Sequence, residues 1–88
     1  MSKREFTQAE DLFRKLLKEL RQQKKLTQTQ LADRLGFPQS YVSKYEAGER
    51  RLDFVETFFV CDALGIGIED LAKAFSTELS SKGRRKRG

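Results

Sequence analysis

The chain has 88 residues, of which 38% are hydrophobic and 35% are charged, values typical of one small folded domain. One cysteine and no histidine are present, which excludes an internal disulfide, zinc sites of thiolate and imidazole ligands, and histidine-dependent catalysis. No apolar run approaches the roughly 20 residues that cross a bilayer, and no signal-peptide pattern opens the chain. We therefore expect a cytoplasmic protein without membrane contact.

The net charge of +5 is concentrated at one end of the chain. Five basic residues lie between Lys82 and Arg87, which leaves 13 of the 18 basic side chains against 13 acidic ones in residues 1–81. Residues 14–25 hold six bases and one acid, whereas residues 53–70 hold five acids and no base. One end of the domain is therefore expected to attract polyanions, although two solvated helix faces would give the same pattern.

The first predicted helix has apolar residues at the i, i+3, i+4 spacing of a core-facing stripe. These residues are Ala9, Leu12, Phe13, Leu16, Leu17 and Leu20. Thr7 and Glu10 form a capping box, which we expect to begin this helix. Its end is expected near residues 23–25, where lysines suit the negative end of the helix dipole.

Two short helices follow, each with a clear end signal. The second begins at Thr27, whose capping partner is Gln30, and is expected to end at Gly36. The third is predicted over residues 39–47 and ends at Gly48. Two helices of this length with a three-residue turn match the helix-turn-helix motif, in which the second helix enters the DNA major groove.

Two further helices complete an all-α fold of five helices. Asp53 and Glu56 form a capping box that begins the fourth helix. The fifth is predicted over residues 68–79, with its end as early as residue 75. The folded domain is therefore expected to cover residues 1–79, followed by a disordered basic tail over residues 80–88 that either follows DNA phosphates or only keeps the protein soluble.

The fourth helix is predicted to pack on the core through one apolar face. This face consists of Phe54, Phe58, Cys61 and Leu64, with Cys61 as a small core hydrophobe rather than a reactive thiol. Val55 and Phe59 then point away from the core, where they are either covered by the fifth helix or exposed as a contact surface. With Phe75, they are the residues that we expect at a twofold dimer interface.

The outward face of the third helix carries amide, hydroxyl and ammonium groups. It is formed by Gln39, Ser40, Ser43 and Lys44. These groups are the ones that pair with base edges and phosphates, although an ordinary solvated helix face has the same composition.

The segment from Leu26 to Asp53, LTQTQLADRLGFPQSYVSKYEAGERRLD, resembles the core of the Cro and phage-repressor helix-turn-helix family, often called the XRE family. The elements T-Q-x-x-L-A, L-G and S-x-V-S-x-Y-E-x-G occur at the spacing of that family, and the resemblance extends from about Leu12 to Leu71. It implies a compact, lambda-repressor-like bundle that binds double-stranded DNA.

The resemblance also implies roles for individual residues. Gln28 resembles the glutamine that holds a DNA phosphate and steadies the next one, Gln39, which would pair with an adenine. The other implied contacts to bases and backbone fall on Ser40, Ser43, Lys44, Arg50 and Arg51. Glu46 resembles a buried glutamate whose partner is an arginine of the first helix, here Arg21, and we interpret this pair as structural.

One position departs from the family pattern. Many relatives have Ser or Thr where this chain has Pro38, and proline cannot cap the recognition helix through a hydroxyl group. Its fixed φ nevertheless suits the first turn of a helix, so only the register of the helix start is affected.

The sequence has no paired carboxylates, metal-ligand spacing or glycine-rich phosphate loop, so we predict a protein that is not an enzyme and has no cofactor, metal or small-molecule ligand. The predicted function is a sequence-specific transcriptional regulator of bacterial or phage origin. We expect it to act as a repressor and to bind two DNA half-sites as a homodimer. The alternatives are an antitoxin that binds a toxin protein and its own operator, and an adaptor that has lost DNA binding.

Overall fold

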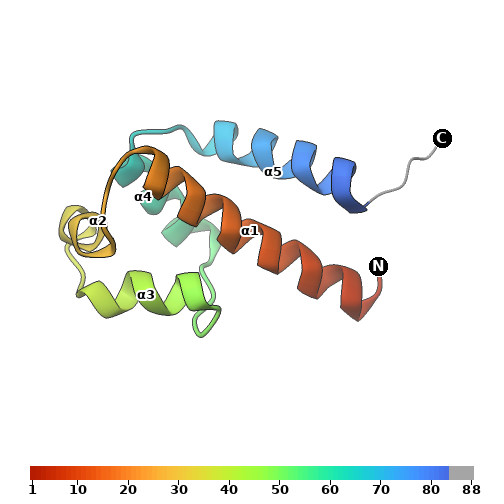
Figure 1. Ribbon diagram of the computed structural model, residues 1–88, viewed down its shortest axis with the longest axis horizontal. Helices are drawn as coiled ribbons and strands as arrows, with labels where there is room; N and C mark the ends of the chain where they lie inside the picture. Colours follow the sequence, from red (N-terminus) through yellow and green to blue (C-terminus); the bar gives the residue numbers. More distant parts are fainter. Residues whose placement is uncertain (84–88) are drawn as a thin grey trace.

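The computed structural model describes residues 1–83, and all of the regular secondary structure in this range is helical (Figure 1). The helices are α1 (Lys3–Gln23), α2 (Gln28–Leu35), α3 (Gln39–Ala47), α4 (Phe54–Leu64) and α5 (Ile68–Gly83). The predicted all-α class with five helices is therefore confirmed. Among the described residues, no helix is long and apolar enough to cross a membrane.

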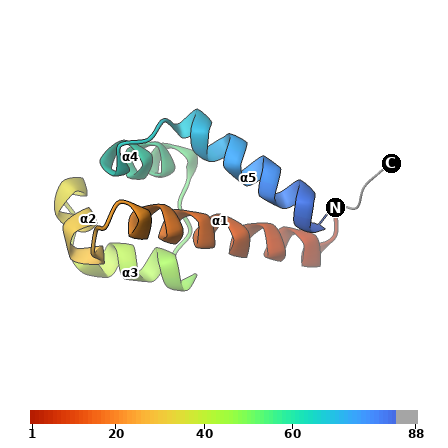
Figure 2. The same ribbon diagram turned by 45° about the horizontal axis from the view of Figure 1, so that its top comes forward.

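The long helix α1 runs through the middle of the molecule. In both Figure 1 and Figure 2, α3 lies on one side of α1 and α5 on the other, while α2 closes the end that carries the carboxyl terminus of α1. The start of α1 and the end of α5 both lie at the opposite end of the molecule. This arrangement leaves the outer side of α3 uncovered by any other helix.

Every helix contributes to one apolar core. Its buried residues are Leu17, Leu31, Ala32, Val42, Tyr45, Val60, Cys61, Leu64 and Leu71. Cys61 is completely buried, as predicted, and burial raises the pKa of its thiol to about 11. The thiol is therefore protonated at neutral pH and acts as a small apolar group.

The local signals around α2 and α4 act as predicted. Thr27 with Gln30, and Asp53 with Glu56, form complete capping boxes, in which each side chain bonds to the backbone N–H of the other residue. α2 ends at Gly36 with φ +80°, a left-handed conformation that glycine adopts without a steric penalty.

The predicted start of α1 is wrong. The helix begins at Lys3, because Ser2 and Glu5 form a complete capping box one turn before the predicted one. Thr7 and Glu10 lie inside the helix. The two candidate boxes follow each other without overlap, and the earlier one prevails because it adds hydrogen-bonded turns to a helix that is already nucleated.

The predicted inner face of α4 is also partly wrong. Cys61 and Leu64 are buried as expected, but Phe54 is 72% exposed and Phe58 is 44% exposed. Thr57 and Val60 take their places on the core side, where the Thr57 hydroxyl donates to the Asp53 carbonyl at 2.7 Å. Val55 and Phe59, predicted to point away from this face, are exposed rather than covered by the fifth helix. Because α4 is apolar around most of its circumference, its sequence periodicity does not identify the side that faces the core.

α5 is longer than predicted. It continues through Ser80 to Gly83, into the segment that the sequence assigned to the basic tail. Residues 84–88 of that tail lie outside the described residues. Phe75, expected at a dimer interface, is half-buried and packs edge-on against Phe13 of α1, with their ring centroids 6.4 Å apart.

Candidate nucleic-acid interface

α2 and α3 form a tight helix-turn-helix. The Phe37 amide donates to the Ala32 carbonyl at 3.0 Å and so closes the turn after α2. Ala32 is 1% exposed and Val42 of α3 is completely buried, so the small side chain and the β-branched one lie where the two helices pack. α3 starts at Gln39 as predicted, with Pro38 at the N-cap position and no capping hydrogen bond from a side chain.

Two glutamine side chains and a glutamate form a chain of hydrogen bonds between the start of α2 and α3. Gln39 donates through Nε2 to Gln28 Oε1 at 2.7 Å, and Gln28 donates through Nε2 to Glu46 Oε1 at 2.9 Å. The contact that the resemblance implied between Gln28 and Gln39 is thus present in the free protein. Gln39 retains its Oε1 acceptor and its second N–H, which together match the donor and acceptor on the major-groove edge of an adenine.

The chain of hydrogen bonds ends on a buried ion pair. Arg21 Nε lies 2.7 Å from Glu46 Oε2, and Arg21 Nη2 donates to Glu46 Oε1 at 3.0 Å. Their side chains are only 9% and 4% exposed. The hydrogen bond to Glu46 raises the pKa of Arg21, which stays charged. The bidentate geometry is the strong form of an arginine–carboxylate contact.

Arg21 also fixes the start of α2. Its Nη1 donates to the carbonyl of Leu26 at 2.7 Å, immediately before the N-cap residue Thr27. One guanidinium group therefore joins α1, the start of α2 and, through Glu46, α3. Arg21 therefore positions Gln28 in two ways, by fixing the start of α2 and by holding Glu46, to which Gln28 donates.

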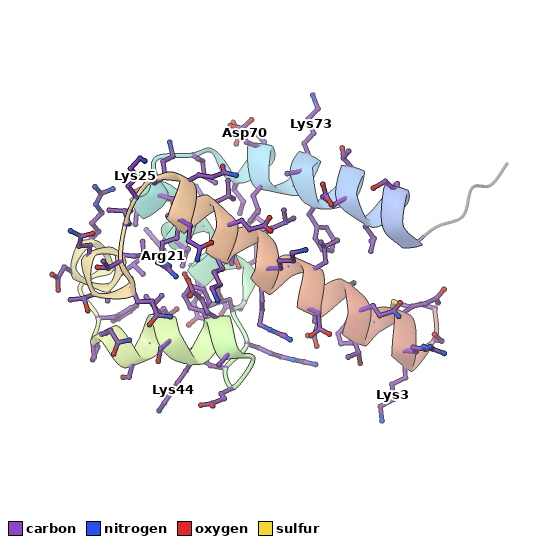
Figure 3. All side chains as sticks on the ribbon, viewed as in Figure 1. Lys3, Arg21, Lys25, Lys44, Asp70 and Lys73 are labelled. Atoms are coloured by element: carbon purple, nitrogen blue, oxygen red, sulfur yellow. The ribbon has the colours of Figure 1, made fainter. Side chains whose placement is uncertain are left out.

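The other predicted residues of α3 differ in their exposure. Ser40 and Lys44 are exposed, and Figure 3 shows Lys44 projecting away from the body of the molecule on the open side of α3. Ser43 is half-buried, and its hydroxyl donates to the Ser40 carbonyl at 3.4 Å. The open side of α3 therefore presents amide, hydroxyl and ammonium groups together.

Arg50 is held by groups that the sequence did not reveal. Its Nη2 lies 2.8 Å from Glu56 Oε2, and its guanidinium carbon lies 4.8 Å from the centroid of the Tyr41 ring. Tyr41 donates its hydroxyl to the same oxygen of Glu56 at 3.0 Å. These contacts connect α3 to the start of α4, so Arg50 is more engaged with the protein than its predicted role as a phosphate contact implied.

The same cluster shifts two protonation equilibria. Burial, followed by the hydrogen bond to Glu56, raises the pKa of Tyr41 to about 12. The Asp53 backbone amide, followed by Arg50, lowers the pKa of Glu56. Tyr41 is therefore a neutral donor and Glu56 a charged acceptor at neutral pH.

Arg51 connects the loop after α3 to α1. Its Nε lies 3.0 Å from Glu10 Oε2, and its guanidinium carbon lies 5.4 Å from the centroid of the Phe6 ring. Its side chain is still 74% exposed, so the guanidinium group is open to solvent. The partners of Arg51 lie about forty positions earlier in the chain, a pairing that no local sequence signal indicates.

Metal binding receives no support from the arrangement of the ligating side chains. Within residues 1–83, no group of three or more His, Cys, Asp or Glu side chains is placed to hold a metal ion.

Comparison with known proteins also identifies a helix-turn-helix protein. The sequence model of a helix-turn-helix family matches residues 17–75. A solved structure of an XRE-family like protein from Pseudomonas syringae pv. tomato superimposes with a TM-score of 0.79 at 37% sequence identity, covering 83% of this chain and 89% of that one. The chain belongs to the XRE family of helix-turn-helix proteins.

A curated relative within the XRE family supports this assignment. The chain is 36% identical over 67 residues to an uncharacterized HTH-type transcriptional regulator, YqaE, from Bacillus subtilis. The match covers 76% of this chain and 58% of the relative, so the chain spans little more than half the length of that protein. The first 14 helical residues of α1, residues 3–16, precede the part that matches the XRE-family model.

Proposed function

We propose that this protein is a sequence-specific transcriptional regulator that binds double-stranded DNA, with α3 as the recognition helix. The observation that carries the proposal is the hydrogen-bond chain from Gln39 through Gln28 to Glu46. This chain orients one amide group at the start of an uncovered helix and leaves a donor and an acceptor of that amide available. A preoriented amide at that position suits bidentate readout of an adenine in the major groove.

The groups around Gln39 suit the contacts that accompany base readout. Ser40 and Lys44 are exposed beside it on α3, and Arg51 is exposed on the following loop. Hydroxyl and cationic groups of this kind bind phosphate oxygens, which supply much of the affinity and its dependence on salt. Ser43 is assigned a smaller part because it is half-buried, and Arg50 contributes mainly by holding the loop through Glu56. Occupation of a promoter by this domain would repress transcription.

The regulator is further proposed to act as a twofold dimer on two half-sites. One recognition helix covers too few base pairs for useful specificity in a genome, whereas two helices one helical turn apart double the recognised sequence. The exposed apolar surface of α4 suits this pairing. It is formed by Phe54, Val55, Phe58 and Phe59, which are between 44% and 72% exposed. The originally predicted set of Val55, Phe59 and Phe75 is thus extended by Phe54 and Phe58, while Phe75 lies at its inner edge.

Selection of bound duplexes from a random DNA library tests the proposal. We expect enrichment of one sequence with two related half-sites whose centres are about 34–36 Å apart. A single half-site would retain the DNA-binding function and contradict the dimer. Failure to enrich any sequence, with folded protein and at low salt, would contradict the proposed function.

The apolar surface of α4 also keeps one other function open. An antitoxin of the same fold would use such a surface for a toxin protein and would bind its own operator through α3. A stable one-to-one complex with the product of a neighbouring gene, combined with a monomeric free protein, would favour the antitoxin. A homodimer in the absence of any other protein would favour the regulator.

A further inference from the structure

The first turn of α1 carries two cations that the stability of the helix does not explain. Lys3 and Arg4 are exposed and occupy the first two helical positions. The amino-terminal end of a helix has a partial positive charge, so cations at these positions oppose the dipole and weaken the helix. The start of α1 is stabilised by Ser2 and Glu5, whose capping box satisfies its backbone donors. Another role is therefore expected for the two cations.

The fold brings these cations to the side of the molecule on which α3 is open. Figure 1 shows the start of α1 on the same side of the molecule as α3. In Figure 3, the side chains of Lys3 and Lys44 project toward this side, whereas Asp70 and Lys73 of α5 project from the opposite side. A duplex that contacts Lys44 would therefore continue past the start of α1.

The length of α1 takes Lys3 beyond the sequence that α3 can read. Its 21 residues span about 30 Å, the length of about nine base pairs at roughly 3.4 Å each. The described molecule is elongated, with extents of 44 × 23 × 21 Å. Lys3 thus lies at the distal end of the long axis, where it would reach backbone phosphates outside the half-site.

The acidic groups of the same stretch are neutralised by arginines. Asp11 pairs with Arg14, and Glu10 pairs with Arg51 from the loop after α3. The contacts of Arg51 with Glu10 and Phe6 also attach this part of α1 to the recognition motif. The start of α1 is therefore held in a fixed position relative to α3, and Glu10 and Asp11, one to two turns further along α1, have arginine partners.

We propose that the first turn of α1, through Lys3 and Arg4, binds the phosphate backbone of duplex DNA outside the half-site contacted by α3. This inference rests on the proposed DNA-binding function and adds a contact from residues that precede the matched family segment. The contact is with phosphates only, so it extends the bound length of DNA without adding sequence preference.

The test compares two variants that lose the same charge. Lys3→Gln removes the cation next to the proposed DNA path, and Lys73→Gln removes an exposed cation on the opposite side. We expect Lys3→Gln to weaken binding several-fold at low salt and to reduce the slope of log affinity against log salt by about 0.9. Lys73→Gln should change neither quantity, and Lys3→Arg should retain wild-type binding.

Thermal unfolding separates this role from a structural one. Lys3→Gln removes an unfavourable interaction with the helix dipole, so its midpoint should equal or exceed that of the wild type while its DNA affinity falls. A lower midpoint with unchanged affinity would contradict the inference.

Shortening the DNA locates the contact. The wild type should bind a short duplex, which lacks the base pairs flanking the selected site, as weakly as Lys3→Gln binds the long duplex. Lys3→Gln should bind the short and the long duplex with equal affinity. Equal affinities and salt slopes for Lys3→Gln and Lys73→Gln would overturn the inference. If the wild type prefers no sequence, the proposed function fails, and the comparison of the two variants on random duplex DNA still decides whether Lys3 contacts phosphate.

Discussion

α3 and α4 each bury one side in the same core and expose the other, but the exposed sides differ in chemistry. α3 presents Gln39, Ser40 and Lys44, whose polar groups are oriented by hydrogen bonds or free to reach outward. α4 exposes a group of large apolar side chains, among them Phe54 and Phe59, with Asp62 as its one exposed charged residue. The difference suits the two kinds of partner proposed above: base edges and phosphates for α3, and another protein surface for α4.

The two surfaces are mechanically connected. Tyr41 on α3 donates to Glu56 near the start of α4, and Arg50 from the loop between them contacts both. The orientation of α3 relative to α4 is therefore fixed by side chains as well as by the core. In a twofold dimer formed through α4, this connection would set the distance between the two recognition helices.

The largest effect is expected from breaking the anchor beneath α3. Arg21→Ala or Glu46→Ala leaves an uncompensated charge at a site where both side chains are nearly buried, so each variant should lose about 3–5 kcal/mol of unfolding free energy. The double variant should lose clearly less than the sum of the two. Urea denaturation measures all three values.

The exposed pair Lys15 and Glu19 provides the control for this cycle. Their charged atoms are 4.0 Å apart and both side chains are largely in water, so the coupling free energy should lie below about 1 kcal/mol. Additive losses for Arg21 and Glu46 would contradict the role of their ion pair as an anchor.

The second effect concerns the apolar surface of α4. Phe59 is 54% exposed, so Phe59→Glu should change the unfolding free energy of the monomer by less than about 1 kcal/mol. Placed in a dimer interface, the new charge is desolvated without a partner, and the protein should become monomeric and lose most of its affinity for the full site. Analytical ultracentrifugation and binding to the full site measure the two consequences.

Ser76→Glu adds the same charge at an exposed position on α5 and should leave the dimer intact. A Phe59→Glu protein that still sediments as a dimer would show that the copies pair through another surface.

A third comparison uses two tyrosines of α3. Tyr41→Phe removes a hydrogen bond to the charged Glu56 and should cost about 1–2 kcal/mol of unfolding free energy. Tyr45→Phe removes a buried hydroxyl that has no partner among the described residues, so stability should stay constant or rise by up to about 1 kcal/mol. Equal losses in thermal unfolding would mean that the Tyr41 hydroxyl does not connect α3 to α4.

The smallest effect is a dependence of stability on alkaline pH. The pKa of Tyr41 is raised from 10.0 to about 12 in the folded protein, so its contribution is complete below pH 10 and is lost as the pH rises through 12. Tyr41→Phe should therefore reduce the loss of stability between pH 10 and about pH 12. An unchanged pH profile would contradict the assigned position of the Tyr41 hydroxyl.

How well the sequence predicted a contact depends on how far apart the two residues lie in the chain. The capping boxes at Thr27 and Asp53 involve residues three positions apart, so the sequence contains both partners in one short window. The contact of Gln28 with Gln39 was implied by resemblance to the XRE family rather than by spacing. Arg51 and Glu10 are 41 positions apart and come together only because α1 continues past the recognition motif.

The errors have physical causes of the same kind. α4 could not be oriented from its sequence because Phe54 and Phe58 are as apolar as the residues that the core selects. The burial of Thr57 depends on a hydrogen bond to Asp53 that satisfies its hydroxyl, which makes a polar residue compatible with the core side. Such choices are made by tertiary packing, which overrides the local pattern.

The affinity of Gln39→Ala for the selected site, measured beside its affinity for random duplex DNA, tests the central claim most directly. If the Gln39 amide reads a base while Gln28 holds it in place, the substitution should cost about 1–3 kcal/mol on the selected site and leave binding to random DNA nearly unchanged. Equal weakening on both DNAs would show that Gln39 contacts only the backbone and would contradict the assignment of α3 as the helix that reads sequence.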